Sequence, residues 1–378
     1  SMYGVNASIP KTLVRWLIAA EAERAEEPLR TELRAAFTSA LMFARDRKAD
    51  IFIISGDLFD GEYVTRDTRE FITRELAKLA PMPVFIAPGN HDPFTAGSPF
   101  EALSKLQNVH VFGAARERVE LPELGTDIYG VGFTSRYMLS SPVAGWETAD
   151  PSRVNILVCH GDMTSASSQT APITEAEIAA SGFDYIALGH IHKASGVLRA
   201  GRTYYAYPGC IEGRGFDETG KKGALFGAVE KGECSVAQYY FSKCRYEEIT
   251  VDIGGCNDKF EAVDRIRAAM RPYAEDTELR VRLCGELREP FNILPAEFGR
   301  GAELPRSIEL VDNTLLLPDI GELEGENTLR GVFCRKMLAR IKKLPEGSAE
   351  YRECELALRY GLAALQDRPV ADYSEEER

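Results

Sequence analysis

Residues 83–92 read PVFIAPGNHD, an apolar run that stops abruptly at a polar cluster. Three further segments have the same form, and their sequences are DIFIIS-GDLFD at 50–60, RVNILVC-HGD at 153–162 and FDYIAL-GHIH at 183–192. Short apolar runs of this kind are typical of strands that are buried on both faces of a sheet. The pattern therefore predicts four buried strands, each followed at its carboxyl end by a polar loop.

Helical patterns separate these runs. Apolar residues recur at helical spacing over 28–48, and further helices are predicted near 66–79, 98–106 and 173–181. Strands that alternate with helices in this way predict a layered α/β fold. Open sheets of this class bind their ligands at the carboxyl ends of the strands. The four polar loops are therefore predicted to form one functional site.

Histidines are few and unevenly placed in the chain. Of the five, at 91, 110, 160, 190 and 192, all except His110 lie in the loops that follow predicted strands. Imidazole and carboxylate groups together favour Mn²⁺, Fe²⁺ or Zn²⁺ over Ca²⁺, and an amide oxygen can add a neutral ligand. Two such ions about 3.5–4 Å apart can activate water and stabilise both oxygens of a phosphate displacement. His110 lies inside a strand-like run, and we expect it to be structural.

Bulk composition restricts the function only loosely. The 378-residue chain has a net charge of −13, which argues against a broad basic surface for nucleic acid but permits a local basic channel. Its eight cysteines form no CxxC pair, so neither a zinc knuckle nor a redox dithiol is expected. The sequence contains no run of about 18 apolar residues, and its first residues lack the order of a secretory signal. We therefore expect a cytoplasmic protein with reduced thiols and no membrane association.

The four polar loops resemble, in order, four motifs of the calcineurin-like metallophosphoesterase superfamily. The matching motifs are GDLFD at 56–60, GNHD at 89–92, HGD at 160–162 and GHIH at 189–192. The resemblance implies a four-layer α/β sandwich, in which two β-sheets are flanked by helices. It also implies two divalent metal ions, with Mn²⁺ as the first expectation and Fe²⁺ or Zn²⁺ as alternatives.

The resemblance assigns metal-binding roles to five residues. Asp57 is similar to the carboxylate that bridges the two ions. The other ligands of one ion would be Asn90, His160 and His190. His192 would bind the second ion. The glycines beside these residues would let backbone and substrate approach closely.

Two further residues in the same loops are given catalytic roles by the resemblance. His91 is similar to a histidine that does not bind metal but contacts the phosphate and protonates the leaving oxygen. Asp60 resembles a carboxylate that orients this histidine. An equally weighted alternative is that Asp60 only caps its own loop.

The superfamily also has an Asp-x-His motif at the end of its first strand, and no Asp-x-His occurs in the 378 residues. We expect the first strand and its motif to lie upstream of Ser1. A naturally degenerate relative is the alternative. In either case the chain without the motif is expected to be impaired as an enzyme.

The segment after the last motif favours one branch of the superfamily. It contains YPG at 207–209, Gly213-Arg214 and ETGKKG at 218–223, and it resembles the corresponding region of DNA-repair exonucleases of the SbcD/YhaO type. Arg214 is accordingly expected to bind substrate, although a simple series of β-turns is the alternative. The implied function is a metal-dependent DNA exonuclease or endonuclease. The alternatives are a small-molecule phosphodiesterase or nucleotidase, and a catalytically weak structural subunit.

Three parts of the chain are expected to differ in role. Residues 1–245 would form the nuclease domain, residues 246–320 a smaller α+β capping domain, and residues 321–378 a pair of C-terminal helices. Basic residues gather in these helices at 330, 335, 336, 340, 342 and 343. They predict a solvated face or, alternatively, a contact with DNA phosphates or with an ATPase partner of the SbcC/YhaN kind. A homodimer is a further alternative.

Overall fold

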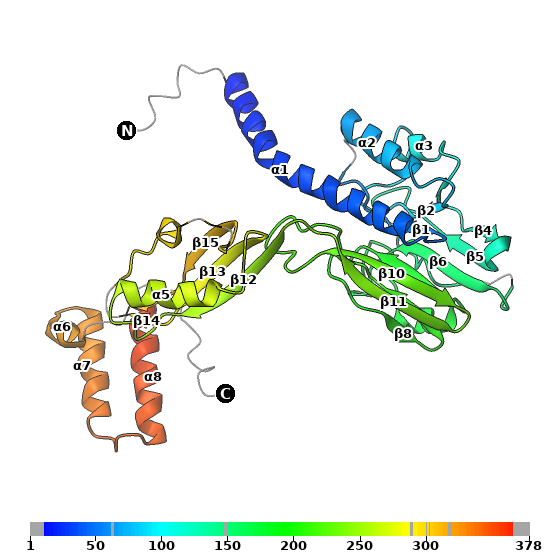
Figure 1. Cartoon of the computed structure of the whole chain (residues 1–378). Helices are drawn as coiled ribbons and strands as arrows, with labels where there is room; N and C mark the ends of the chain where they lie inside the picture. Colours follow the sequence, from blue (N-terminus) through cyan, green and yellow to red (C-terminus); the bar gives the residue numbers. More distant parts are fainter. Residues whose placement is uncertain are drawn as a thin grey trace. The chain divides into compact units, whose positions relative to one another are not determined.

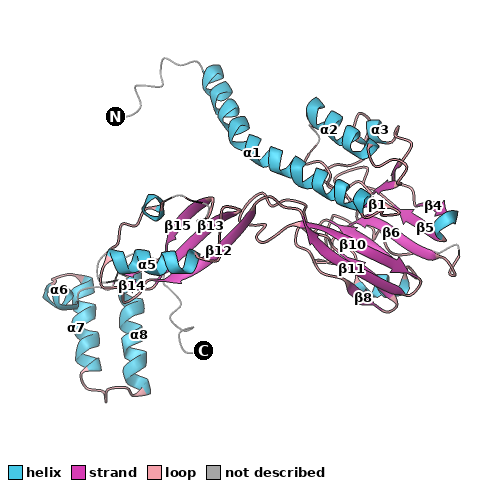
Figure 2. Ribbon diagram, viewed as in Figure 1, coloured by secondary structure: helices cyan, strands magenta, loops and turns pink. Residues whose placement is uncertain are grey.

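The computed structural model describes residues 11–61, 64–146, 150–287, 290–299, 301, 303–316 and 320–365 (Figures 1 and 2). Contacts divide the chain into two compact units. The first comprises residues 1–247 with 276–278, and the second comprises residues 248–275 with 279–378. The expected three-part division by role stays a prediction.

A small parallel sheet opens the first unit. Its strands, in the order β1-β2-β3, are Phe52–Ile54, Val84–Ile86 and Val109–Val111. Three helices accompany this sheet, namely α1 (Lys11–Asp46), α2 (Arg66–Ala77) and α3 (Phe100–Leu103). Buried apolar side chains from these helices and one face of the sheet form a single cluster, which includes Leu41, Leu76, Val84, Ile86 and Phe100. Helix α1 begins earlier than the expected start at residue 28.

The second sheet of this unit has six strands in the order β4-β5-β6-β7-β9-β8. Their bounds are Glu117–Leu121, Thr126–Gly130, Val154–His160, Tyr185–Gly189, Thr203–Ala206 (β9) and Leu198–Ala200 (β8). The pairs from β5 to β9 are parallel, whereas β4 and β8 are antiparallel to their neighbours. A short 3-10 helix, η1 (Pro122–Leu124), joins β4 to β5.

Alternation along the strands produces the layers. In β6, Ile156 and Val158 pack in one cluster with Phe85 of the small sheet. Leu157 of the same strand packs on the opposite face with Ile178 of helix α4 (Glu175–Ala180). Successive side chains of a strand point to opposite faces, so both faces of this sheet are buried. The order helices, sheet, sheet, helix confirms the expected α/β sandwich with two sheets.

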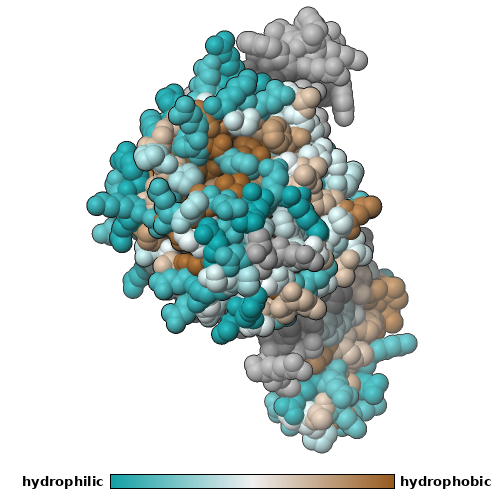
Figure 3. Space-filling model, turned by 90° about the vertical axis from the view of Figure 1, so that its right-hand side faces the viewer, coloured by the Kyte–Doolittle hydropathy of each residue, from teal (hydrophilic) through white to brown (hydrophobic). Residues whose placement is uncertain are grey.

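A hairpin of β10 (Gly223–Glu230) and β11 (Glu233–Tyr240) completes the first unit. Its aromatic side chains pack against helix α1, where the ring of Phe43 lies 5.2 Å from that of Phe226 and 4.9 Å from that of Tyr239. The face of the molecule drawn in Figure 3 is dominated by hydrophilic residues, between which smaller apolar areas are visible.

The second unit combines short strands with helices. Its main sheet has the order β12-β13-β15, with bounds Arg245–Asp252, Thr277–Cys284 and Ser307–Asp312, and β14 (Glu286–Leu287) pairs with β16 (Leu315–Leu316). Only Gly285 separates β13 from β14, and it has a left-handed φ of 103°. The helical elements are α5 (Lys259–Met270), η2 (Pro295–Phe298), α6 (Ile320–Gly325), α7 (Leu329–Ile341) and α8 (Ala349–Ala364). None of the helices in the described residues is long and apolar enough to cross a membrane.

Candidate metal centre

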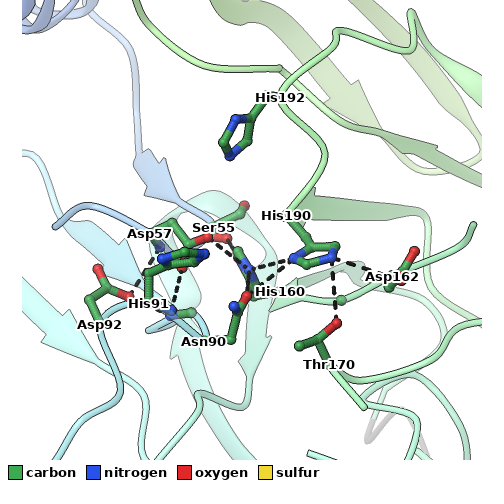
Figure 4. Close-up of polar contacts among 12 residues, drawn as sticks. Ser55, Asp57, Asn90, His91, Asp92, His160, Asp162, Thr170, His190 and His192 are labelled. Carbon is green, nitrogen blue, oxygen red and sulfur yellow. Dashed lines mark hydrogen bonds and ion pairs between the residues drawn. The ribbon is translucent and has the colours of Figure 1, made fainter. Parts of the chain in front are cut away.

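Strand register brings the four motif loops to one edge of the two sheets. In the small sheet, β1 and β2 are parallel with Ile54 opposite Ile86, so the loops that carry Asp57 and Asn90 leave the sheet side by side. In the large sheet, β6 and β7 are parallel with His160 opposite Gly189. The next residue, His190, therefore lies beside His160, as Figure 4 shows.

Four ligand-type side chains converge at this edge. The Nε2 atom of His160 lies 2.9 Å from Oδ1 of Asn90, 3.3 Å from Oδ2 of Asp57 and 3.3 Å from Nδ1 of His190. The same Oδ1 atom of Asn90 lies 3.2 Å from Nδ1 of His190. Among the described residues, Asp57, His160 and His190 form the one group of three whose ligand atoms all lie within 4.8 Å of one another. The structure thus brings together four of the five expected metal ligands.

The hydrogen bond that His160 makes with the backbone gives this convergence the character of a cation site. Its Nδ1 atom lies 2.8 Å from the carbonyl oxygen of Ser55, which can only accept a hydrogen bond. Nδ1 must therefore carry the proton, and in the neutral ring Nε2 keeps its lone pair. That lone pair faces a carboxylate oxygen and an amide oxygen, both of which also accept. The residues present therefore fit a divalent cation, because a positive ion between these atoms removes their mutual repulsion.

His190 is held from its other side. Its Nε2 atom lies 3.5 Å from Oγ1 of Thr170 and 3.9 Å from Oδ2 of Asp162. Burial lowers the pKa of His190, which favours the neutral ring that binds metals. Asp162 also accepts a 2.7 Å hydrogen bond from the backbone N–H of Thr164, so it caps the following turn as its position in the sequence indicates. Nothing in the sequence marked Thr170 as a neighbour of the site.

Asp92 is a buried carboxylate that ties two motif loops together. It accepts hydrogen bonds from the backbone N–H groups of Gly89 at 2.7 Å, Phe59 at 3.0 Å and Asp57 at 3.1 Å. Its two oxygens therefore hold its own loop and the loop of Asp57 together. Burial, together with the charge of Asp57, raises the pKa of Asp92 to about 7.

Asp57 is fixed by close approach of the same two loops. Its Oδ1 atom accepts a 3.0 Å hydrogen bond from the backbone N–H of His91. A Cβ atom at position 89 would collide with this carboxylate, so only glycine fits there. Although burial acts to raise the pKa of Asp57, the contact with the His160 ring in its charged form and the His91 N–H hold it below its ordinary value. Asp57 therefore carries its negative charge into the site.

The two residues with expected catalytic roles lie beside each other at the rim. Nδ1 of His91 is 3.3 Å from Oδ1 of Asp60, and both side chains are more than half exposed. The other carboxylate oxygen of Asp60 accepts a 2.6 Å hydrogen bond from the guanidinium group of Arg214. Asp60 thus lies between His91 and Arg214. The catalytic roles of His91 and Asp60 and the substrate-binding role of Arg214 stay predictions.

His192 lies apart from the converging ligands and is paired with a residue that the sequence did not single out. Its Nδ1 atom lies 2.5 Å from Oε1 of Glu218. This hydrogen bond raises the pKa of His192. Although burial acts to raise the pKa of Glu218, the hydrogen bond from His192 and the contacts with Arg214 lower it to about 2. Glu218 begins the segment ETGKKG, which resembles DNA-repair exonucleases, and this resemblance is the feature of the sequence that could have indicated it.

Comparison with known proteins gives a family for part of the chain. Residues 30–194, which contain all four motif loops, match the family model described as calcineurin-like phosphoesterase. The chain is 29% identical over 254 residues to the "uncharacterized metallophosphoesterase YhaO" of Bacillus subtilis (strain 168), a match that covers 64% of this chain and 61% of that protein. The chain therefore spans less than two thirds of this relative's length. A solved structure, the crystal structure of TT1561 of Thermus thermophilus, aligns with 14% identity and a TM-score of 0.34 over 47% of this chain and 84% of the other.

Proposed function

Because residues 30–194 form a calcineurin-like phosphoesterase domain, we propose that this chain is a metal-dependent phosphodiesterase that cleaves DNA. One observation supports the proposal most directly. The ligand atoms of Asp57, Asn90, His160 and His190 converge, and in the neutral ring of His160 the lone pair of Nε2 faces two oxygens that can only accept. Divalent ions bound there would polarise a phosphate oxygen and favour attack by water. Mn²⁺ is the proposed ion, with Fe²⁺ and Zn²⁺ as alternatives, because the ligand set mixes nitrogen and oxygen.

The side chains at the rim would act on the substrate directly. We propose that His91 donates a proton to the oxygen that leaves, because its ring is exposed beside the converging ligands while its Nδ1 atom contacts Asp60. The negative charge of Asp60 would orient this ring. The guanidinium group of Arg214, which reaches the same carboxylate, would bind a substrate phosphate.

The choice of DNA as substrate rests on the segment after the last motif and on two basic residues. The segment with YPG at 207–209 and ETGKKG at 218–223 resembles that of DNA-repair exonucleases. Arg214 contacts Asp60 at the rim, and Lys193 follows His192 directly in the sequence, so we propose that both present positive charge to a substrate despite the net charge of −13. Such local cations would bind phosphates of a nucleic acid backbone. A DNA-repair nuclease in the cytoplasm is therefore the form of the proposal that best fits these residues.

A catalytically weak structural subunit is a second candidate, which one observation favours. In the described residues, His192 does not belong to the group formed by Asp57, His160 and His190, so the second ion would have few ligands. In such a role the chain would bind an ATPase partner of the SbcC/YhaN kind. The C-terminal helices give this partner limited support, because Arg330 and Lys342 already pair with Glu326 and Glu324 within the same unit. Self-association into a homodimer is an additional proposal.

Hydrolysis assays would separate these functions. Linear single-stranded and double-stranded DNA and nucleotide substrates would be compared in Mn²⁺ and in excess chelator. Mn²⁺-dependent cleavage of DNA is the expected result, and loss of this activity in His160→Ala but not in His110→Ala would locate it at the site. Hydrolysis of nucleotides alone would contradict the DNA proposal, and tight Mn²⁺ binding without any hydrolysis would favour the structural subunit.

A further inference from the structure

Glu218 is a buried carboxylate that the proposed hydrolysis does not yet use. It lies between β9 and β10, and only 4% of its side chain is exposed. Its Oε2 atom accepts a 2.9 Å hydrogen bond from the backbone N–H of Arg214 and lies 3.8 Å from Sγ of Cys210. Its Oε1 atom lies 2.5 Å from Nδ1 of His192 and 3.6 Å from the guanidinium group of Arg214. A buried charge with this many donors around it holds them in place.

The contact with Glu218 determines which nitrogen of His192 is available to a metal. The ionised carboxylate of Glu218 can only accept a hydrogen bond, so Nδ1 of His192 carries the proton and donates it. When the ring is neutral, its lone pair is therefore on Nε2. Figure 4 shows the ring of His192 above the converging ligands and separate from them. Histidines that bind metals are commonly oriented by a carboxylate on the other ring nitrogen.

Glu218 also holds Arg214, which connects it to Asp60 and His91. Arg214, which Glu218 holds through its backbone and its guanidinium group, donates to Asp60 at 2.6 Å. Asp60 in turn lies 3.3 Å from His91. One buried carboxylate thus links the expected ligand of the second ion with the expected phosphate-binding arginine and, through Asp60, with the expected proton donor.

We propose that Glu218 is a positioning residue that keeps Nε2 of His192 available to a divalent ion and holds Arg214 against Asp60. The proposal rests on the proposed phosphodiester hydrolysis for its purpose, although its geometry can be tested without any turnover. Glu218 itself would touch neither the substrate phosphate nor the ion. It would act through His192 and Arg214.

The chain offers a matched control in Glu212. This residue is also a buried glutamate of the segment between β9 and β10, and it is 1% exposed. Its carboxylate accepts hydrogen bonds from the backbone N–H groups of Lys243 at 2.7 Å and Cys244 at 3.2 Å, neither of which belongs to the site. Glu212→Gln and Glu218→Gln therefore disturb the same segment to a similar degree. Only the second changes a group that contacts His192.

Nitrogen-15 NMR of the histidine rings tests the first half of the proposal. The chain has five histidines, so its ring signals are few, and His192 can be assigned with His192→Asn. In the metal-free protein at alkaline pH, the wild type is expected to show His192 with its proton on Nδ1. Glu218→Ala should lose this preference, whereas Glu218→Gln should keep it, since an amide oxygen still accepts. Glu212→Gln should leave the signal unchanged, and an unchanged tautomer in Glu218→Ala would overturn the assignment.

A Zn²⁺ titration followed by the same signals tests the consequence for metal binding. Loss of an outer carboxylate typically weakens metal affinity by roughly 10–100-fold. Glu218→Ala should therefore raise the Zn²⁺ concentration at which the His192 signal shifts by this factor, while the His160 signal responds as in the wild type. If Glu218→Ala does not fold, Glu218→Gln is used instead. In that variant the amide N–H₂ group faces the backbone N–H of Arg214, so Arg214 should be held less well. KM for the substrate should then rise more than kcat falls. An unchanged Zn²⁺ response in Glu218→Ala, or an unchanged KM in Glu218→Gln, would contradict the proposal. Absence of DNA cleavage in the wild type would affect only the proposed function.

Discussion

The Nδ1 atom of His160 lies 2.8 Å from the carbonyl oxygen of Ser55, two residues before Asp57. This contact joins the large sheet to the small one, because His160 ends β6 and Ser55 follows β1. It also directs the Nε2 atom of His160 toward Asp57 and Asn90. The packing of the two sheets and the ligand geometry of the site therefore depend on the same hydrogen bond.

His160→Ala is expected to remove tight Mn²⁺ binding. The ring is a direct ligand in this interpretation, so its loss should cost more than the roughly 10–100-fold that follows loss of an outer partner. Calorimetric titration with Mn²⁺ would measure the change. His110→Ala is the control, because His110 lies in β3 and pairs with Glu117. Equal Mn²⁺ affinity in both variants would show that the converging atoms do not form the metal site.

His91→Ala should retain bound metal but lose most turnover. Its ring faces Asp60 rather than the converging ligands, and only its backbone N–H contacts Asp57. Loss of a positioned proton donor typically lowers the rate by about 10²–10⁴-fold. Parallel measurements of kcat and of Mn²⁺ per chain would test this, with Asp60→Asn expected to have a smaller effect on kcat. If His91→Ala also emptied the site, the histidine would have been misassigned.

Gly89→Ala should damage both stability and metal binding. An added Cβ would meet the carboxylate and the backbone of Asp57, and overpacking of this kind costs about 1–3 kcal/mol. The displaced carboxylate should also bind Mn²⁺ more weakly. Gly113→Ala is a suitable control, since a Cβ there would be at an ordinary 3.6 Å from Glu117. Urea unfolding should give a lower stability, and Mn²⁺ titration a lower affinity, for Gly89→Ala than for Gly113→Ala. Equal values in the two variants would mean that the two loops can move apart without loss of free energy.

Asp92→Asn is expected to destabilise the protein and to loosen the Asp57 loop. An asparagine has a single acceptor oxygen, so it cannot serve the three backbone N–H groups that Asp92 serves now. Buried donors left without partners should cost on the order of 2–4 kcal/mol. Asp184→Asn, which alters a buried carboxylate bonded to Asn155 and Lys231, should lower stability without changing Mn²⁺ affinity. Weakened Mn²⁺ binding in both variants would indicate a global effect instead.

The sequence predicted the strands and the site where local pattern and function coincide. His160 and His190 follow buried strands directly, so the parallel register that brings the strands together also brings the histidines together. The apolar runs likewise predicted the two faces of β6, because its side chains alternate between two cores. In these segments, the position where the strand ends also fixes the position of the metal-binding side chain.

Contacts between loops could not be predicted in the same way. Glu218 lies 26 residues after His192 in a turn-rich segment, and no periodicity relates the two. The sequence around Asp92 likewise does not reveal that the neighbouring loop presents two backbone N–H groups to its carboxylate. Such contacts depend on how separate loops pack. Acidic residues are also too common in this chain for their type alone to identify a partner.

We expect the 378-residue chain to bind one divalent ion tightly. Asp57, Asn90, His160 and His190 provide a nearly complete set of ligands for a first ion. For a second ion, the expected protein ligands are the shared Asp57 and His192, whereas a bound cation usually needs at least three. The sequence contains no Asp-x-His that could add the others.

Water can occupy vacant coordination positions, but it brings no charge, so affinity at the second position should be much lower. Because two-metal hydrolysis needs both ions, turnover should rise with Mn²⁺ well beyond the concentration that fills the first position. Elemental analysis after dialysis against limiting Mn²⁺ should give one ion per chain, and His192→Ala should leave this number unchanged while lowering turnover. Two ions retained with equal affinity, together with full activity at low Mn²⁺, would mean that residues other than Asp57 and His192 complete the second position.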